Sequence, residues 1–189
     1  PRSIAFVQCV GSRDISAGRP YCSGVCCMYA MKNAMLIREK NPEIEVTVFY
    51  NDIRAYGKGY EEYYERAKDL GVRFIRGFPG EVLEGNDCLM MTAENTETGE
   101  VETVHPDLVV LSVGLEPARG AEEVARMLGI PQDESGFFEV ADQKLGPVLT
   151  VRPGIYVAGT VTAPRDIPDS VAMGEAAAMR AYLDTVRAG

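Results

Sequence analysis

The first part of the chain alternates between short apolar strands and helices, and this alternation limits the possible folds more than any other feature. The strands are rich in β-branched and aromatic residues, and the helices place apolar side chains at every third or fourth position. Strands separated by helices are typical of βαβ units, so we expect an α/β fold with a parallel, dinucleotide-domain-like sheet. In order, the sequence predicts a strand at 3–7, a helix at 23–40, a strand at 45–50, a helix at 60–70 and a strand at 72–75.

The next segment has a different pattern. Two runs, LMMTAE and EVETVH, flank a Thr, Glu and Gly turn sequence at 95–99. This arrangement predicts an antiparallel hairpin over residues 88–105. The apolar run LVVLSV at 108–113 then predicts a buried parallel strand.

The pattern changes again after Gly114, where Leu-Glu-Pro interrupts it. We therefore place a candidate domain boundary between residues 1–114 and 115–189. The last predicted helix is rich in alanine, and Asp169 is its expected N-cap. After the boundary the sequence predicts a short helix at 120–128, an irregular stretch at 136–147, a strand at 154–158, a loop at 159–168 and a helix at 169–186.

Composition excludes several classes of function. The formal net charge of -9 argues against a nucleic-acid partner, because binding to a phosphate backbone needs an excess of Lys and Arg. No stretch approaches the roughly 20 apolar residues that a membrane-spanning helix needs. The sequence opens at Pro1 without a secretion signal, so a signal is absent or lies outside this piece, and we expect a cytoplasmic protein.

Four of the five cysteines are clustered with the spacing C-x12-C-x3-C-C. An odd and clustered set does not match the disulfide framework of a secreted domain, so we interpret these thiols as ligands or redox groups. Cys9 follows the first predicted strand, while Cys22, Cys26 and Cys27 stand at the start of the first predicted helix. Cys22 and Cys26 would share a helix face and Cys27 would be turned about 100° away, so the thiols would have to surround a common centre.

An iron–sulfur cluster fits this pattern better than a single atom, and a helix N-terminus stabilises thiolates and an anionic cluster. Buried structural thiols, a zinc site and a redox disulfide remain as alternatives. Zinc is less favoured because the usual C-x2-C pair is missing. Cys88, alone in the predicted hairpin, is interpreted as structural.

Several segments of the chain resemble the A subunit of heterodisulfide reductase, and together they span nearly its whole length. The cysteine-containing phrases are the most specific of them. The matching segments are 6–14 (FVQCVGSRD), 21–33 (YCSGVCCMYAMKN), 52–66 (DIRAYGKGYEEYYER), 108–117 (LVVLSVGLEP), 154–160 (GIYVAGT) and 166–172 (DIPDSVA).

The resemblance implies a thioredoxin-reductase-like core in which an FAD-binding domain is interrupted by a second dinucleotide-domain-like module. Residues 1–114 would be the inserted module, and 115–189 the C-terminal part of the FAD-binding domain. The four clustered cysteines would bind a 4Fe-4S cluster beside FAD. In bifurcating complexes of this family, which belong to anaerobic metabolism, FAD splits electron pairs between a high-potential and a low-potential path.

Two features of the residues agree with this resemblance. The loop after the first strand reads QCVGSR in place of G-x-G-x-x-G, so the phosphate loop that NAD(P) needs is missing. The predicted strand at 154–158 is followed by a glycine turn and a helix start, whose backbone amides can hold a flavin, although a tight turn alone would also explain the glycine. The expected cofactor-binding residues are Lys32, Gly159, Thr160, Asp169, Ser170 and Val171. For Lys32 there is a simpler alternative, an ordinary solvated lysine on the helix surface.

The family's N-terminal FAD motif and ferredoxin-type cysteine runs do not occur in this sequence. We therefore interpret the chain as a fragment or split subunit whose missing FAD-domain half is supplied by another chain or has been removed from this piece. The expected function is an electron-transfer module of an oxidoreductase, inactive alone, with other redox subunits as partners. A non-catalytic scaffold is the alternative, while a pyridine-nucleotide-dependent disulfide reductase would want a C-x-x-C pair that the chain lacks.

Overall fold

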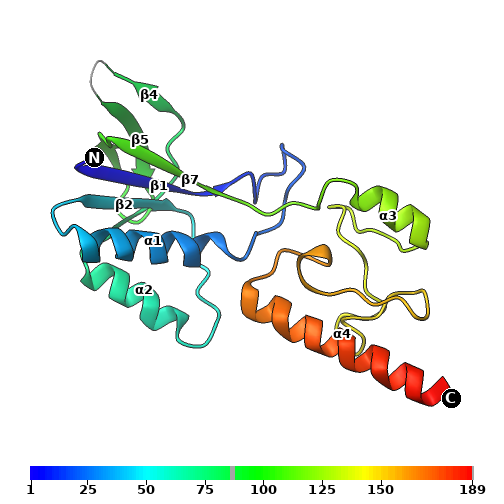
Figure 1. The fold of residues 1–189 in the computed structure, drawn as a ribbon. Helices are drawn as coiled ribbons and strands as arrows, with labels where there is room; N and C mark the ends of the chain where they lie inside the picture. The colour runs from blue at the N-terminus through cyan, green and yellow to red at the C-terminus, as the bar shows by residue number, and fades with distance from the viewer. Residues whose placement is uncertain (86–87, 189) are drawn as a thin grey trace. The chain divides into compact units, whose positions relative to one another are not determined.

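The computed structural model describes residues 1–85 and 88–188, and the chain divides into two compact units. Unit 1 comprises Pro1–Ser12 and Val25–Gly114, and unit 2 comprises Arg13–Gly24 and Leu115–Gly189. Residues 13–24 thus belong with the second unit, although the predicted boundary would place them in the first. Figure 1 shows the elements of each unit, which we describe separately.

Unit 1 is built on a four-stranded parallel sheet with the strand order β3-β2-β1-β7. Two helices connect the first three strands, as the strand and helix alternation predicts. The α/β fold with a parallel sheet is therefore confirmed. The elements are β1 (Ser3–Val10), α1 (Cys26–Lys40), β2 (Glu45–Tyr50), α2 (Tyr60–Asp69), β3 (Arg73–Arg76) and β7 (Leu108–Val113).

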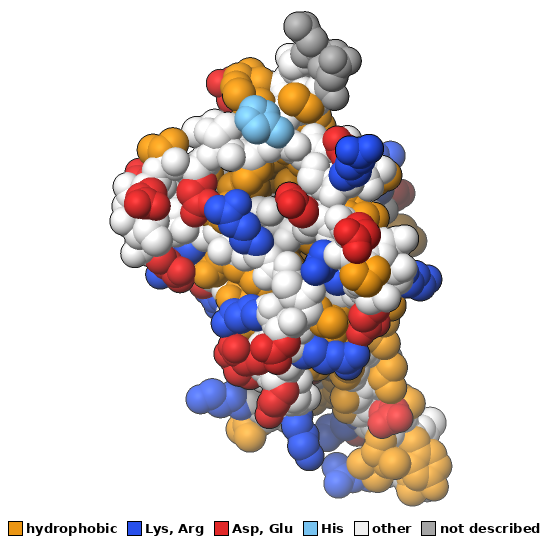
Figure 2. Space-filling view, turned by 90° about the vertical axis from the view of Figure 1, so that its left-hand side faces the viewer, with side chains coloured by type: hydrophobic (Ala, Val, Ile, Leu, Met, Phe, Trp, Pro, Cys, Tyr) orange, Lys and Arg blue, Asp and Glu red, His pale blue; other side chains and the backbone are white. Residues whose placement is uncertain are grey.

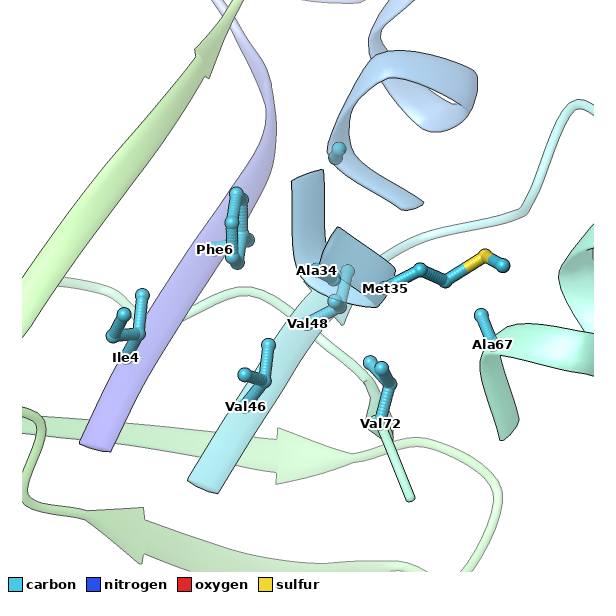
Figure 3. Packing of buried hydrophobic residues seen from close by; sticks show 9 residues of the cluster. Ile4, Phe6, Ala34, Met35, Val46, Val48, Ala67 and Val72 are labelled. Carbon is cyan, nitrogen blue, oxygen red and sulfur yellow. The ribbon is translucent and has the colours of Figure 1, made fainter. Parts of the chain in front are cut away.

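The main core of unit 1 lies between the parallel sheet and the two helices. Figure 3 shows its apolar side chains, which come from β1, β2, α1, α2 and the residue before β3. Every second residue of a strand faces the same side of a sheet, so Ile4 and Phe6 face the helices while Ala5 faces away. This core holds α1, and with it the paired cysteines at its start, against the sheet.

A three-stranded antiparallel sheet covers the other face. It consists of β4 (Val82–Glu84), β5 (Leu89–Asn95) and β6 (Glu100–Val104), and Met91 and Ala93 of β5 pack against the parallel sheet. The predicted hairpin is confirmed. The third strand, β4, was not predicted, because three exposed residues are too few to show a strand period.

The surface of unit 1 carries salt bridges in which at least one side chain of each pair is exposed. Arg66 pairs with Glu39, and Arg73 pairs with Glu102. Figure 2 shows basic and acidic side chains intermixed on the face turned toward the viewer. Exposed pairs of this kind contribute at most about 1 kcal/mol each, so the buried clusters and not the charges hold the unit together.

Unit 2 contains α3 (Ala121–Leu128), the short 3-10 helix η1 (Gly159–Val161) and α4 (Ile167–Ala188). Ala125, Ile130, Phe138 and Val157 form its small core. The predicted helix at 120–128 is confirmed. No helix in the described part of the chain is long and apolar enough to cross a membrane.

Two predictions for unit 2 are wrong. Residues 154–158 form no strand but only an isolated bridge between Leu149 and Tyr156, because no continuous neighbouring strand lies alongside. The last helix begins at Ile167, before the expected Asp169. The carboxylate of Asp166 accepts a hydrogen bond of 2.8 Å from the backbone N–H of Asp169, so Asp166 is the N-cap.

Candidate functional site

Three of the clustered thiols converge at the carboxyl end of the parallel sheet. Cys9 lies near the end of β1, and Cys26 and Cys27 form the first turn of α1, where both are nearly fully buried. Hydrogen bonds from the thiols of Cys27 and Cys9 lower the pKa of Cys26. The pKa of Cys27 is raised because it shares this hydrogen bond with Cys26 and because it is buried. The thiols of Cys9 and Cys27 therefore both lie within hydrogen-bonding reach of the Cys26 sulfur inside unit 1.

The backbone at Cys9 has an unusual conformation that places its thiol in this group. Its φ is 58°, in the left-handed region that few residues other than glycine adopt. The N–H of Ser12 donates a hydrogen bond of 3.1 Å to the carbonyl of Cys9 and closes a turn. The pairing of β1 with β7 shifts in register between Val7 and Val10. Such a conformation costs about 1–3 kcal/mol and is common at functional sites, where surrounding structure maintains it.

The loop after β2 completes the surroundings of Cys27. The backbone N–H of Arg54 donates to its sulfur at 3.5 Å, and its thiol lies 3.8 Å from the carbonyl of Asp52. Arg54 and Asp52 also form an ion pair of 3.1 Å. The end of β1 and the loop after β2 therefore both reach the start of α1, which is the edge where parallel α/β sheets bind ligands. Sequence reasoning did not identify the Arg54 amide, because a backbone donor leaves no mark on residue type.

Cys22 is placed differently from the expectation. It lies before α1 and belongs to unit 2, so the predicted helix face shared with Cys26 is wrong. Gly24 between them has φ 68°, a left-handed conformation through which a right-handed helix does not run. The N–H of Gly24 donates to the Cys22 sulfur at 3.4 Å. Because the two cysteines are four residues apart, their Cα atoms are within about 14 Å of each other by covalent geometry alone.

The segment that carries Cys22 is held within unit 2 by several contacts. Tyr21 packs edge-on against Phe137 with ring centroids 5.3 Å apart. Arg19 pairs with Glu116, and the hydroxyl of Ser23 accepts a hydrogen bond of 2.9 Å from the backbone N–H of Leu115. The position of Cys22 therefore depends on residues more than ninety positions later in the chain, which spacing alone could not reveal.

The donor set fits an iron–sulfur group. None of the five cysteines forms a disulfide. Across residues 1–85 and 88–188, no three His, Cys, Asp or Glu side chains are placed to hold one metal ion. The three converging thiols are nevertheless the ligand type that iron–sulfur clusters use, and they lie at a helix N-terminus with a backbone N–H donor to the Cys27 sulfur.

Two further residues named from the sequence lie apart from these thiols. Cys88 is exposed, with its sulfur 3.9 Å from Nδ1 of His105 at the open end of the hairpin, so it does not fill a core. Lys32 is exposed on α1, away from the face that carries the buried cysteines. Neither residue contacts the thiol group of unit 1 in any described interaction.

The residues expected at a flavin lie close together in unit 2, but their hydrogen bonds differ from the expectation. Gly159 has φ 68°, and a side chain there would lie 3.5 Å from Ser170. Thr160 lies in η1 and is exposed, as are Asp169 and Val171 at the start of α4.

The backbone amides at the start of α4 are already used. The N–H of Asp169 donates to the Asp166 carboxylate, and the N–H of Ser170 donates to the Asp166 carbonyl at 3.0 Å. These two amides are therefore not available to a flavin while Asp166 caps the helix. The sequence did contain a signal for Asp166, since an Asp three residues before another acidic residue resembles a capping box.

A cavity of about 420 Å³ lies near this turn in unit 2. Thr162, Ala163 and Arg165 line one part of it, directly after η1. Phe138 and Glu139 line another part. The sequence did not point to these residues, because none of them belongs to a recognisable motif.

The chain is similar in sequence to known proteins. No protein-family model matches it. It is 49% identical over 189 residues to the A subunit of the H(2):CoB-CoM heterodisulfide,ferredoxin reductase of Methanothermobacter thermautotrophicus, and the match covers 99% of this chain and 29% of the relative. It is 54% identical over 184 residues to an iron-sulfur A subunit of the CoB--CoM heterodisulfide reductase of Methanopyrus kandleri, and the match covers 96% of this chain and 28% of the relative.

Solved structures show the same fold. The thioredoxin reductase of T. acidophilum matches with a TM-score of 0.63 at 20% identity, over 97% of this chain and 53% of that one. The thioredoxin reductase of Lactococcus lactis matches with a TM-score of 0.61 at 25% identity, over 98% of this chain and 53% of that one. The fold is therefore thioredoxin-reductase-like. The chain spans less than a third of the length of its curated relatives and belongs to the family of heterodisulfide reductase A subunits.

Proposed function

We propose that the chain is an electron-transfer module of a heterodisulfide-reductase-like complex. Its cluster would be held by Cys9, Cys22, Cys26 and Cys27, and its flavin by residues of unit 2. The observation that carries this proposal is the convergence of three thiols at the ligand-binding edge of a thioredoxin-reductase-like fold. When bound, a 4Fe-4S cluster would supply single-electron transfer, and FAD would take up or release electrons singly or in pairs.

The residues around the thiols are suited to hold negative charge. Cys26 and Cys27 occupy the first turn of α1, where the unpaired backbone N–H groups and the helix dipole favour anions. The N–H of Arg54 adds a donor to Cys27. The burial of both cysteines keeps water away from their sulfur atoms. The last ligand, Cys22, is proposed from its spacing in the sequence and its short covalent connection to Cys26.

For FAD we propose the turn at Gly159 and Thr160, together with the start of α4 at Asp169, Ser170 and Val171. Gly159 and Ser170 already lie against each other in unit 2, which supports this assignment. Because Asp166 uses the amides of Asp169 and Ser170, contacts there would come from side chains and from the glycine turn. A role for Lys32 at the flavin rests on the family resemblance alone.

The apolar surface of α4 supports a partner for unit 2. Ile167, Val171, Met179, Tyr182 and Val186 follow one side of this helix, and each side chain is more than half exposed. A stripe of this kind on a long helix is normally covered by another layer of the same domain. We propose that the remaining part of an FAD-binding domain covers it, and that residues 1–114 and 115–189 are the inserted module and the C-terminal part of that domain.

The activity of the whole complex is also a proposal. The chain would act as an oxidoreductase subunit that is inactive alone and works with other redox subunits. Electron bifurcation at the flavin is the finer role that the family resemblance implies. It would require the rest of the flavin site.

Anaerobic reconstitution with iron and sulfide tests the proposed function. We expect the unsubstituted chain to gain the visible absorbance of a cluster and, after reduction, an electron paramagnetic resonance signal. Single substitutions of Cys9, Cys22, Cys26 or Cys27 by Ser should weaken or abolish both signals. The matched control is Cys88→Ser, which should leave them unchanged. A chain that gains no cluster signal, or a Cys88→Ser variant that loses it like the others, would contradict the proposal.

A further inference from the structure

A buried glutamine next to Cys9 has no hydrogen-bond partner. Gln8 is only 2% exposed, and neither Nε2 nor Oε1 of its side chain has a partner within the described part of the chain. A primary amide loses its hydrogen bonds to water on burial, and most buried polar side chains regain them from the protein. An unpartnered buried amide at the end of a strand therefore points to a group that is bound there.

The strand alternation shows which way Gln8 faces. Ile4 and Phe6 lie on the side of β1 that packs against α1, and Gln8 continues the same series toward the carboxyl end of the strand. Because α1 connects two parallel strands, it runs back along the sheet, and its first turn lies at that carboxyl end (Figure 1). Gln8 therefore lies on the face of β1 that packs against α1, toward the end of the sheet where the first turn of α1 carries Cys26 and Cys27.

A second buried donor follows Cys9. Ser12 is 3% exposed, and its hydroxyl also has no partner among the described residues. Ser12 is held next to Cys9 by the turn in which its N–H donates to the Cys9 carbonyl. Two unpartnered donors, one on each side of Cys9 in the sequence, are thus buried where the thiols converge.

We infer that Gln8 is a positioning residue for the iron–sulfur group, an inference that rests on the proposed function. Its side-chain N–H would donate a hydrogen bond to a sulfur of the cluster or of a ligating thiolate, and Ser12 would add a weaker second donor. Hydrogen bonds to sulfur stabilise the reduced, more negatively charged state of a cluster and so raise its reduction potential. Gln8 would therefore favour the reduced form.

The test is the substitution Gln8→Met, which keeps a side chain of similar length and removes both polar groups. In the reconstituted chain we expect the variant cluster to have a lower potential, with about a tenfold change in the ratio of reduced to oxidised cluster at a fixed potential. That ratio corresponds to about 59 mV for one electron. Ser12→Ala should shift the potential in the same direction by less. The matched control is Gln132→Met in unit 2, where Nε2 of the glutamine donates to the Gly136 carbonyl, and it should leave the potential unchanged.

Unfolding of the metal-free protein separates this role from a structural one. Gln8→Met should leave the midpoint of unfolding unchanged or higher, because it removes an unsatisfied buried group. If Gln8→Met is as stable as the unsubstituted chain and yet assembles no cluster, the positioning role is supported. A metal-free variant that is clearly destabilised would show a structural role and overturn the inference.

Two other outcomes would also overturn it. A Gln8→Met cluster with an unchanged potential would refute the role of Gln8 and leave the proposed function intact. Failure of the unsubstituted chain to assemble a cluster would refute the proposed function, and this inference with it.

Discussion

The two units differ in how completely they bury their apolar residues. Unit 1 has a sheet covered on both faces, and Phe6 and Phe49, on opposite faces, are 1% and 0% exposed. Unit 2 has one small core around Phe138, while α4 leaves Met179 and Tyr182 more than half exposed. Unit 1 thus has a layer on each face of its sheet, although Leu111 and Val113 of the edge strand β7 stay exposed. Unit 2 has a long helix with an apolar side that its described residues do not cover.

The largest expected effect is on the core of unit 1. Phe6→Ala should lower the free energy of unfolding by about 3–5 kcal/mol, because it removes a fully buried aromatic side chain and leaves a cavity. Met179→Ala in α4 should change it by no more than about 0.5 kcal/mol, because Met179 is 58% exposed. Denaturant unfolding followed by circular dichroism measures both. Equal losses in the two variants would mean that α4 is packed as tightly as the sheet.

The difference in burial between the two units also explains which helices and strands could be predicted from the sequence. The strands and helices of unit 1 were predicted closely, and β2 and β7 have the expected limits. Most residues of β2 face a core that the chain itself supplies. The predicted burial of β7 is wrong, because β7 is an edge strand on which Leu108, Leu111 and Val113 are exposed. The strand expected at 154–158 does not form, since a strand needs neighbours and only a single bridge is present. The local sequence pattern predicts a helix or strand correctly where the elements that pack against it belong to the same chain.

The prediction of the candidate site from the sequence was limited in the same way. The strand and helix pattern correctly placed Cys26 and Cys27 at the start of a helix, but it placed Cys9 just past the first strand, whereas Cys9 lies within β1 near its end. It misplaced Cys22, because the left-handed conformation of Gly24 prevents the helix from extending back to it. The unpartnered amide of Gln8 and the N–H of Arg54 depend on three-dimensional placement, which no spacing reports.

A smaller effect is expected at the start of α4. Asp166→Ala removes the carboxylate that accepts the N–H of Asp169 and should destabilise unit 2 by about 1 kcal/mol. Asp169→Ala keeps the backbone N–H and the cap, so it should cost less. Hydrogen exchange of the amides in the first turn of α4 measures the difference. If Asp169→Ala loosened this turn more than Asp166→Ala, our assignment of the N-cap would be wrong.

The smallest expected effect is on the stability of the folded state at acidic pH. Hydrogen bonds from the backbone N–H groups of Arg2 and Ser3 lower the pKa of Asp107 below its usual value of 3.8. Its carboxylate therefore stabilises the folded state above that value, and this contribution is lost as the pH falls through the lowered pKa. The effect is small because Asp107 is at the surface.

Asp107→Asn tests this dependence. The variant should be slightly less stable than the unsubstituted chain at neutral pH, and the difference should shrink toward zero at strongly acidic pH. Thermal unfolding at a series of pH values measures it. The comparison is Asp142→Asn in unit 2, where backbone N–H groups of Leu145 and Lys144 lower the pKa in the same way. A difference that grows on acidification would contradict the assignment.

Among the four cysteines proposed to hold one iron–sulfur cluster, Cys22 is the most demanding to test because it lies outside α1. The most direct measurement is the iron and acid-labile sulfide content per chain after anaerobic reconstitution and desalting, for the unsubstituted chain, Cys22→Ser and Cys88→Ser. We expect a full 4Fe-4S complement in the unsubstituted chain and Cys88→Ser, and a clear loss in Cys22→Ser. Equal iron and sulfide in all three proteins would contradict the four-cysteine cluster.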